Sequence, residues 1–408
     1  MSQLYLFNPG YEMEILYGKS HFTPPFTIQK MVADLELLPV WYGGGGSFTL
    51  VRNIKSTQFV KSMPKFFQQK LSSPMILNPM MRELFKCKKS GKKPNLPVLN
   101  VEVWGLSSRC LEVFQEFKTH GMNINIPEWK DEIGELTKRQ TAATCLTRLQ
   151  ERCPITPTIE IPQFYTDIEG IKSYMQTHEA PYVLKTPLSS SGRGLHWIKD
   201  NKLATSDETW LSGSFKRQGA VSIEPALNKA LDFAAEFYSD GEGNIEYVCL
   251  SVFETQANGQ FVGCLLGTQE SLLQRLNEYI SPDDYMFLVE QIRQVLTEVI
   301  GNNYKGFLGV DMMIYHTNDG NYAVHPFVEL NLRNTMGIVA MQLSMNFIHP
   351  ESQGLFRINY YVYDAEQQHQ RMMAESPLIC ENNLIRSGYL SLCPVYNDTH
   401  YLAFVEVF

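Results

Sequence analysis

The feature that most constrains the fold is the stretch GVDMMIYHTNDGNYAVHPFVELNLR, which occupies residues 309–333. Two apolar segments with residues typical of strands flank an Asp-Gly pair, and this combination is a strong signal for a β-hairpin. Asp311 lies on the first predicted strand, and Glu329 and Asn331 lie on the second. Because side chains two residues apart on a strand point to the same face, a hairpin can bring the oxygens of these three residues to one place.

The residue types in this hairpin indicate a metal site. Two carboxylates and one amide oxygen are hard ligands of the kind that Mg²⁺ prefers. A polar face turned toward solvent is the alternative interpretation. However, the neighbouring residues are largely apolar, and charged residues inside apolar strands are usually paired or bind a metal. We therefore predict that Asp311, Glu329 and Asn331 hold a divalent metal.

A second informative stretch is YVLKTPLSSSGRGLHWI at residues 182–198. An apolar run ends at Lys185, a loop of serine and glycine follows, and a second apolar run comes after the loop. This order differs from a P-loop, in which the lysine follows the glycines and opens a helix. Two interpretations remain at this point. The stretch is either an ordinary hairpin with a mobile tip or a phosphate-binding loop of another design, whose small residues let backbone N–H groups approach the phosphates.

The first part of the chain, residues 1–135, alternates strand-like and helix-like segments, which is typical of an α/β layer. PVWY at residues 39–42 is a candidate second strand. The four glycines at 43–46 do not form G-x-G-x-x-G, and no helix clearly follows them. We therefore expect a flexible loop there, in preference to a Rossmann phosphate turn.

The remainder of the chain has a different pattern. An amphipathic helix begins near residue 136, and the segments after it are strands separated by Asp-Gly or Asn-Gly turns, which are hairpin signals. One long helix is expected at 283–300, so that this part reads as an α+β domain. The last residues return to strands, and 388–408 read as a closing hairpin.

Taken in order, these motifs resemble those of the ATP-grasp superfamily over about residues 136–337. The resemblance implies an α+β ATP-grasp fold of antiparallel sheets with helices, preceded by an α/β pre-ATP-grasp domain. The implied domains are residues 1–135 for the preceding domain, 136–345 for the ATP-grasp domain with its nucleotide and metal site, and 346–408 for a β-rich extension packed on it.

The resemblance also implies roles for individual residues. In this family the nucleotide is held by a lysine at the head of a helix, a lysine at the end of a strand, a glycine-rich loop, a hinge with a glutamate, and an acidic residue for the ribose hydroxyls. The matching residues are Lys138, Lys185, Ser189, Ser190, Ser191, Gly192, Arg193, Gly194, Glu224, Ala226, Leu227 and Asp232. Asp311, Glu329 and Asn331 match the metal ligands. Arg333 matches the arginine of the frequent E-x-N-x-R form, and the resemblance gives it a catalytic role on the acylphosphate or the transferring group.

Two features fall outside the family pattern. Pro225 stands where a lysine is common after the hinge glutamate, so contact with adenine would rest on the backbone. The stretch FNPGYEME at residues 7–14 follows the first predicted strand. Its polar residues Asn8, Glu12 and Glu14 either touch substrate or belong to a plain strand-ending turn.

The activity implied by the resemblance is ATP- and Mg²⁺-dependent ligation, with Mn²⁺ as an alternative metal. The carboxylate of a small molecule or peptide attacks ATP to give an acylphosphate, from which an amine or thiol displaces phosphate. No covalent enzyme nucleophile is required, and the sequence offers no defensible Ser-His-Asp or Cys-His constellation. The alternatives are a kinase on the same scaffold and a catalytically silent nucleotide-binding regulator, although the complete metal set argues against a silent protein. A homodimer is a possible assembly by family resemblance.

Composition limits the class of protein and the cellular compartment that we expect. The formal net charge of −8 argues against a nucleic-acid binder. The lysine-rich KCKKSGKKP at 86–94 is a local exception, read as a solvated loop or as a flap that attracts an anionic substrate. The eight cysteines form no C-x-x-C pair, which favours reduced thiols over a metal-thiolate site. No run of about 18 apolar residues and no signal-peptide pattern is found, so we expect a cytoplasmic protein without a membrane partner.

Overall fold

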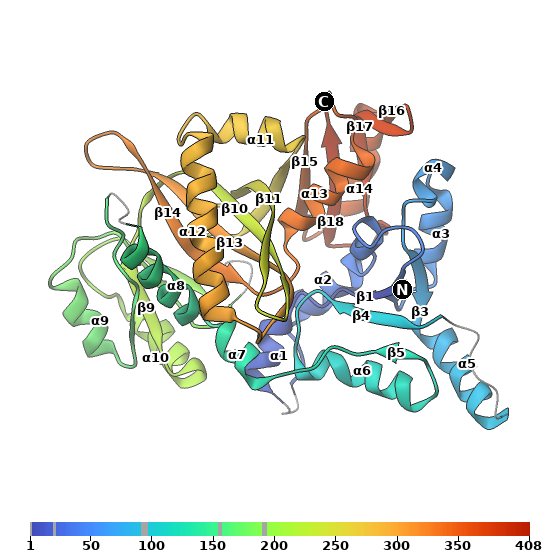
Figure 1. Cartoon of the computed structure of the whole chain (residues 1–408), viewed down its shortest axis with the longest axis horizontal. Helices are drawn as coiled ribbons and strands as arrows, with labels where there is room; N and C mark the ends of the chain where they lie inside the picture. Colours follow the sequence, from blue (N-terminus) through green and yellow to red (C-terminus); the bar gives the residue numbers. More distant parts are fainter. Residues whose placement is uncertain (1, 19–21, 91–96, 154–156, 190–193) are drawn as a thin grey trace. The chain divides into compact units, whose positions relative to one another are not determined.

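The structure is a computed structural model, and it describes the chain apart from residues 1, 19–21, 91–96, 154–156 and 190–193 (Figure 1). The chain forms two compact units, each built from segments that are distant in sequence. The unit that includes both chain ends, called here the terminal unit, comprises residues 1–129, 263–269 and 333–408. The central unit comprises residues 130–262 and 270–332.

The terminal unit contains a parallel sheet with the strand order β3-β2-β1-β4-β5. Its strands are β1 (Ser2–Leu6), β2 (Phe48–Val51), β3 (Ser73–Ile76), β4 (Leu99–Val103) and β5 (Ile124–Asn125). The connecting helices are α1 (Tyr11–Tyr17), α2 (Phe26–Leu35), the 3₁₀ helix η1 (Leu38–Trp41), α3 (Lys55–Ser62), α4 (Lys65–Gln68), α5 (Leu77–Ser90) and α6 (Ser108–Thr119). Parallel strands joined through helices confirm the α/β layer expected for the first part of the chain.

The C-terminal residues, together with β12 from the middle of the chain, add antiparallel strands to the same unit. These follow the order β12-β15-β18-β17-β16, and two helices accompany them. The bounds are β12 (Phe261–Leu266), α13 (Met336–Phe347), β15 (Gly354–Tyr360), α14 (Ala365–Glu375), β16 (Ile379–Glu381), β17 (Leu384–Ser391) and β18 (Tyr401–Val407). Gly388 pairs with Val407 in the antiparallel ladder of β17 and β18, which confirms the closing hairpin.

The core of the terminal unit joins its N-terminal and C-terminal segments. The rings of Trp41 and Phe347 meet edge to face with centroids 5.1 Å apart, and Phe67 packs on the same Phe347 ring at 5.5 Å. The indole Nε1 of Trp41 donates a hydrogen bond of 2.6 Å to the carbonyl of Leu392. Large buried aromatic side chains contribute much of the apolar area that such a core removes from water.

The central unit contains two antiparallel sheets. The smaller has the order β6-β9-β7-β8, and the larger contributes the run β14-β13-β10-β11. The strands are β6 (Gln163–Tyr165), β7 (Tyr182–Lys185), β8 (Leu195–Ile198), β9 (Val221–Pro225), β10 (Asn228–Asp240), β11 (Ile245–Thr255), β13 (Lys305–His316) and β14 (Tyr322–Asn331). The helices are α7 (Asp131–Leu136), α8 (Arg139–Arg152), α9 (Ile168–Met175), α10 (Thr205–Gln218), α11 (Gln269–Leu276) and α12 (Pro282–Ile300). These elements confirm the α+β pattern and the long helix expected from the sequence.

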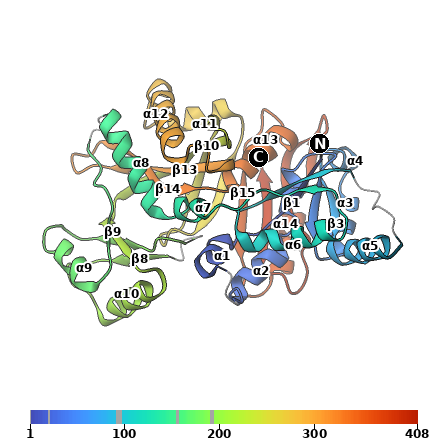
Figure 2. The same cartoon turned by 60° about the horizontal axis from the view of Figure 1, so that its bottom comes forward.

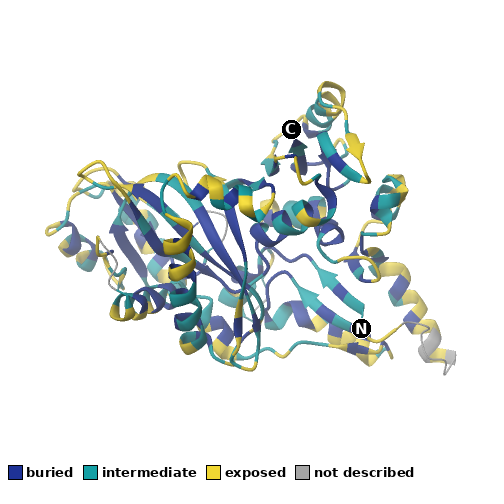
Figure 3. Cartoon of the chain, turned by 45° about the horizontal axis from the view of Figure 1, so that its top comes forward, coloured by how far each residue is buried: buried dark blue, intermediate teal, exposed yellow. Residues whose placement is uncertain are grey.

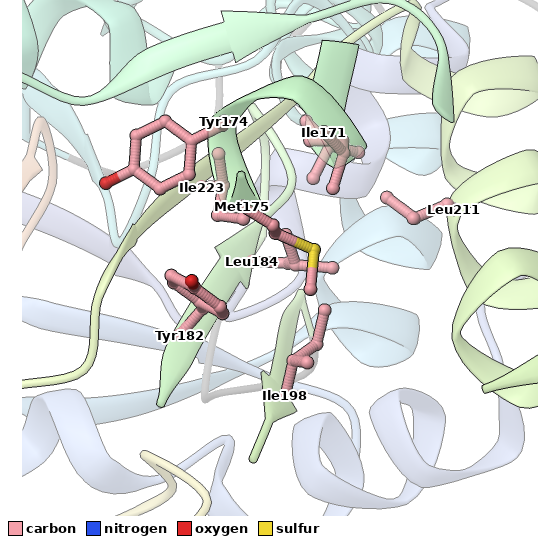
Figure 4. Close-up of a cluster of buried hydrophobic side chains, with 9 residues drawn as sticks. Ile171, Tyr174, Met175, Tyr182, Leu184, Ile198, Leu211 and Ile223 are labelled. Atoms are coloured by element: carbon pink, nitrogen blue, oxygen red, sulfur yellow. The ribbon is translucent and has the colours of Figure 1, made fainter. Parts of the chain in front are cut away.

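The smaller sheet has its own hydrophobic core. Helices α9 and α10 lie beside it (Figures 1 and 2). The core is a cluster of buried side chains from these two helices and the strands, shown in Figure 4: Ile171, Tyr174, Met175, Tyr182, Leu184, Ile198, Leu211, Val221 and Ile223. The apolar run before Lys185 is therefore a core strand, and its packing fixes the position at which that lysine emerges.

Figure 3 shows buried residues concentrated in the long strands of the central unit and in β18, whereas the strands of the parallel sheet mix buried and intermediate residues. The seven cysteines that the structure describes are free thiols. Among the described residues, no helix is both long enough and apolar enough to span a membrane.

One sequence expectation about local structure was wrong. PVWY at 39–42 is not a strand, because residues Leu38–Trp41 form η1 with Pro39 in its first turn. The amide of Tyr42 donates to the carbonyl of Pro39 at 3.3 Å, which closes the turn. Proline has no N–H for a strand ladder but suits the start of a helix. The short apolar run reflects burial, since Val40 and Trp41 are in the core, and burial alone does not distinguish a helical turn from a strand.

The glycines at 43–46 form a loop, as expected, and a strand rather than a helix follows them. Gly44 and Gly46 have φ of 73° and 84°, in the region that favours glycine. The stretch at residues 7–14 is more regular than a plain turn. Helix α1 begins there at Tyr11, directly after Gly10.

Candidate functional site

A cavity of about 560 Å³ lies within the central unit. Its walls come from β7, β8 and β9 of the smaller sheet, from β10, β11, β13 and β14 of the larger sheet, and from the first residue of α8. Seven of the residues that the sequence nominates line it: Lys185, Glu224, Ala226, Leu227, Asp232, Asp311 and Glu329. They come from segments up to about 140 residues apart, so the fold alone brings them to one place.

Strands β13 and β14 form the predicted hairpin. Asp311 lies directly opposite Glu329, and Gly309 lies opposite Asn331. The amide Nδ2 of Asn331 donates to Oδ2 of Asp311 at 3.1 Å. The two carboxylates and the amide thus come from adjacent strands, and these hard oxygen donors fit a Mg²⁺ ion. The described residues contain no group of three or more His, Cys, Asp or Glu that could hold a metal, so the set depends on the amide of Asn331.

Lys185 and Glu224 form a buried ion pair at the smaller sheet. The Nζ of Lys185 lies 2.6 Å from Oε2 of Glu224, and the hydroxyl of Ser222 donates to the other carboxylate oxygen at 3.2 Å. Burial by itself would raise the pKa of Glu224, but the charge and hydrogen bond of Lys185 outweigh it and lower the pKa below its ordinary value. Glu224 therefore stays charged at neutral pH.

His325 of β14 is a buried neutral group beside this pair. Burial, followed by the charge of Lys185, lowers its pKa to about 4. Its Nδ1 faces the amide N–H of Phe327 at 3.3 Å, which places the ring proton on Nε2. His325 lines the cavity, and it adds no charge there at neutral pH. Its burial is that of a core or supporting residue.

Arg139, which the sequence did not nominate, is the cationic residue that α8 places in the cavity. Its Nη2 lies 3.0 Å from Oε1 of Glu329 and 3.1 Å from Oγ of Ser189. The neighbouring Lys138, which the sequence did nominate, is the N-cap of α8. Its Nζ lies 2.7 Å from Oε1 of Glu135, and Lys138 is not among the cavity residues. The sequence pattern nominated a cation at the head of this helix, and of the two adjacent cations there the structure places Arg139 in the cavity.

Asp232, nominated for the ribose hydroxyls, lies at the start of β10 with two polar partners. Lys229 Nζ lies 2.5 Å from its Oδ2, and the hydroxyl of Thr255 donates to the same oxygen at 2.6 Å. Both partners line the cavity. The sequence gave no signal for them, because Thr255 is brought to Asp232 by the pairing of β10 and β11.

The hinge between β9 and β10 supplies Ala226 and Leu227 to the cavity. The N–H of Ala226 donates to the carbonyl of Pro181 at 2.8 Å, and Pro225 has no N–H to offer. If the hinge contacts the adenine ring, as the sequence predicts, the contacts would be made by the backbone carbonyl groups of the hinge and by Leu227.

The loop after β7 is described at its two ends. Ser189 contacts Arg139, and the carbonyl of Gly194 accepts a hydrogen bond of 3.0 Å from Thr186 N–H. A Cβ atom on Gly194 would lie 2.3 Å from Thr186 Oγ1 and from Ser189 Cβ, so only glycine fits. The other nominated loop residues, Ser190, Ser191, Gly192 and Arg193, lie outside the described residues.

Arg333 belongs to the terminal unit. Its Nε lies 3.5 Å from Oε1 of Glu12, and it forms an isolated bridge with Gly105. The side chain of Asn8 also bonds to Gly105, with its Nδ2 donating to the Gly105 carbonyl at 2.7 Å. Glu14 accepts a hydrogen bond from Ser107. Three polar residues of the stretch at 7–14 thus gather near Arg333 and Gly105.

Comparison with known proteins supports the fold. No family model matches this sequence, and no curated protein matches it. Several solved structures resemble the whole chain at low sequence identity. The biotin carboxylase domain of Hydrogenobacter thermophilus 2-oxoglutarate carboxylase, in complex with MgADP, ADP and bicarbonate, has a TM-score of 0.53 and 11% identity, and the match covers 100% of this chain and 86% of that one.

Two further structures give similar values. Biotin carboxylase from Campylobacter jejuni, in complex with β-γ-ATP, has a TM-score of 0.52 and 11% identity over 100% of this chain and 88% of that chain. N5-carboxyaminoimidazole synthetase from Staphylococcus aureus has a TM-score of 0.50 and 11% identity over 100% and 92%. At this identity the likeness shows the fold, and it confirms the fold class expected from the sequence.

Proposed function

Because the chain has the ATP-grasp fold, we propose that it is an ATP- and Mg²⁺-dependent ligase, which activates a carboxylate as an acylphosphate for attack by an amine or a thiol. One observation carries the proposal. A single cavity gathers a buried lysine–glutamate pair, an acidic residue with a hydroxyl neighbour, and two facing carboxylates. A solvated polar surface would not hold Lys185 and Glu224 in a buried pair. The neighbours crystallised with ADP or β-γ-ATP support a nucleotide as the occupant.

The nucleotide would be held along the cavity. Lys185 and Arg139 would face the phosphates, and Asp232 would accept hydrogen bonds from the ribose hydroxyls. Ala226 and Leu227 would border the base. Asp311, Glu329 and Asn331 would hold the metal, which neutralises phosphate charge during transfer when it is bound. Ser189 and Gly194, the described ends of the loop after β7, would lie near the phosphates.

The reaction would need positioning and charge neutralisation rather than a covalent enzyme group. A substrate carboxylate oxygen forms a bond to the γ-phosphorus, and the bond from that phosphorus to the bridging oxygen of ADP breaks. The nitrogen of an amine, or a thiol sulfur, then forms a bond to the acyl carbon, and inorganic phosphate leaves with the former carboxylate oxygen. The attacking group loses its proton to solvent or a base. Arg333 would steady the acylphosphate.

The reaction class is tested by phosphate release. The protein is incubated with ATP, Mg²⁺ and pools of carboxylates, with amines and thiols added or left out. Bicarbonate belongs in the carboxylate pool, because a neighbouring structure holds it. We expect phosphate release only when a carboxylate and an acceptor are both present. Glu329→Gln should lower the rate by about 10²-fold or more, since charge stabilisation at the transferring group is commonly worth that much.

The matched control is Glu151→Gln. Glu151 lies on α8 and pairs with the exposed Arg148, so this variant should keep the wild-type rate. A phosphorylated product that accumulates whether or not an acceptor is present would exclude the ligase and favour a kinase.

A further inference from the structure

Arg139 contacts one of the oxygens that the proposed metal site would use. The guanidinium Nη2 lies 3.0 Å from Oε1 of Glu329, at the distance of a charge-assisted hydrogen bond. The side chain of Arg139 is mostly buried, with 10% exposed, whereas that of Glu329 is 28% exposed. Water therefore reaches the carboxylate more readily than the guanidinium.

The backbone of Arg139 is fixed independently of its side chain. Its N–H donates to the carbonyl of Pro187 at 3.0 Å, which ties the start of α8 to the segment after β7. The same Nη2 atom that meets Glu329 also lies 3.1 Å from Oγ of Ser189. The side chain can therefore change partners while the residue itself stays in the cavity wall.

A guanidinium and a divalent cation cannot both sit on Glu329 Oε1 at low cost. Two positive groups a few ångströms apart repel each other, and the repulsion grows where burial lowers the effective dielectric. The guanidinium already supplies the positive charge that compensates Glu329. A metal that takes Oε1 would displace it, and the displaced guanidinium would then need another anion in the same cavity.

The two lysines that the sequence nominated for the nucleotide already have carboxylate partners. Lys185 is paired with Glu224 at 2.6 Å, and Lys138 is paired with Glu135 at 2.7 Å. Neither of those glutamates is a predicted metal ligand. Arg139 is therefore the residue whose pairing connects the nominated nucleotide site to the nominated metal site.

We propose that Arg139 and the divalent metal compete for Glu329. This inference rests on the proposed function in one respect. The anion that would pair with the displaced guanidinium, and so free Glu329, is a phosphate group of the bound nucleotide. Metal binding is then weak without nucleotide, and nucleotide and metal strengthen each other's binding by the same factor, as linkage requires. Arg139 acts as a positioning residue that controls when the metal site becomes available.

Mn²⁺ binding to the protein without nucleotide tests the competition. Free Mn²⁺ is measured by electron paramagnetic resonance during titration of the wild type, of Arg139→Met, and of Arg139→Met combined with Glu329→Gln. Arg139→Met should bind Mn²⁺ at least about tenfold more tightly than the wild type, because Glu329 loses its compensating cation. The added Glu329→Gln should remove that gain, which assigns it to this carboxylate.

Arg148→Met is the matched control, since Arg148 lies on the same helix with its side chain 58% exposed, and it should bind Mn²⁺ as the wild type does. Circular dichroism checks that each variant is folded, and Arg139→Gln replaces Arg139→Met if the latter is not. Equal Mn²⁺ affinity of the wild type and the folded Arg139 variant would overturn the competition.

A parallel titration with ADP and Mg²⁺ separates this inference from the proposed function. Binding of ADP to the wild type together with an unchanged Mn²⁺ affinity in the Arg139 variant would refute the competition alone. A gain in Mn²⁺ affinity in a protein that binds no ADP would support the competition and refute the nucleotide-dependent function.

Discussion

Two of the ion pairs in the cavity, Lys185–Glu224 and Arg139–Glu329, differ in how far water reaches them. The side chains of Lys185 and Glu224 are 9% and 11% exposed, and the Nζ–Oε2 distance is 2.6 Å. In the other pair Glu329 is 28% exposed, and its contact with Arg139 is longer, at 3.0 Å. A carboxylate that water hardly reaches cannot exchange its cation without a large desolvation cost, whereas a carboxylate that is partly exposed to water can. The first pair therefore reads as a fixed part of the cavity and the second as exchangeable.

The environment of the two pairs explains this difference. Lys185 and Glu224 come from adjacent strands, where Val183 faces Glu224 and Lys185 faces Ser222, and the core of the smaller sheet packs behind them. Arg139 and Glu329 come from a helix start and a strand near its end. Their contact crosses between two elements, so side-chain motion can break it without disturbing a ladder.

The largest expected effect comes from breaking the fixed pair. Lys185→Met should lower the free energy of unfolding by about 3–5 kcal/mol, because it leaves the buried charge of Glu224 without a partner. Urea denaturation at pH 7 measures this loss in the free energy of unfolding. Lys185→Met combined with Glu224→Gln should recover most of the loss, since no buried charge remains. A double variant as unstable as the single one would show that lost packing, rather than the unpaired charge, sets the cost.

Arg139→Met is the comparison variant for that experiment. Its cost should be about 1 kcal/mol, because water can solvate Glu329 once the guanidinium is gone. If Arg139→Met lowers the free energy of unfolding as much as Lys185→Met does, the two pairs do not differ in the way described here.

A smaller effect is expected from pH, through His325. Its pKa of about 4 lies below the ordinary value of 6.5, so the unfolded chain binds more protons than the folded chain between these values. The stability that this neutral group contributes is complete above pH 6.5 and falls as the pH falls toward 4, by roughly 3 kcal/mol at most. Urea denaturation from pH 7.5 to 5 should show the decline, and His325→Gln should flatten it. An unchanged slope in that variant would assign the decline to other groups.

Much of the cavity could be predicted because its residues sit in strong local patterns. The Asp-Gly turn between two apolar segments predicted a hairpin that can bring Glu329 close to Asp311, and the structure pairs these two residues. A strand-end lysine followed by a serine and glycine loop marked Lys185 in the same way. These signals concern neighbours in sequence or across one hairpin, which is the range at which strand periodicity carries information.

The other features of the site and the fold depend on contacts and orientations that local sequence patterns do not predict. Whether Lys138 or Arg139 faces the cavity is decided by the direction of the first turn of α8, and adjacent residues on a helix point about 100° apart. Thr255 reaches Asp232 through the ladder of β10 and β11. PVWY at 39–42 was misread because a buried helical turn and a buried strand are equally apolar.

The central claim is that this cavity holds a nucleotide together with a metal at Glu329. Titration calorimetry with ADP, in the presence and absence of Mg²⁺, tests it most directly, on the wild type and on Glu329→Gln. We predict that Mg²⁺ tightens ADP binding to the wild type by about tenfold or more, and that Glu329→Gln binds ADP but loses this gain. No ADP binding by the wild type, or an equal gain from Mg²⁺ in both proteins, would contradict the account.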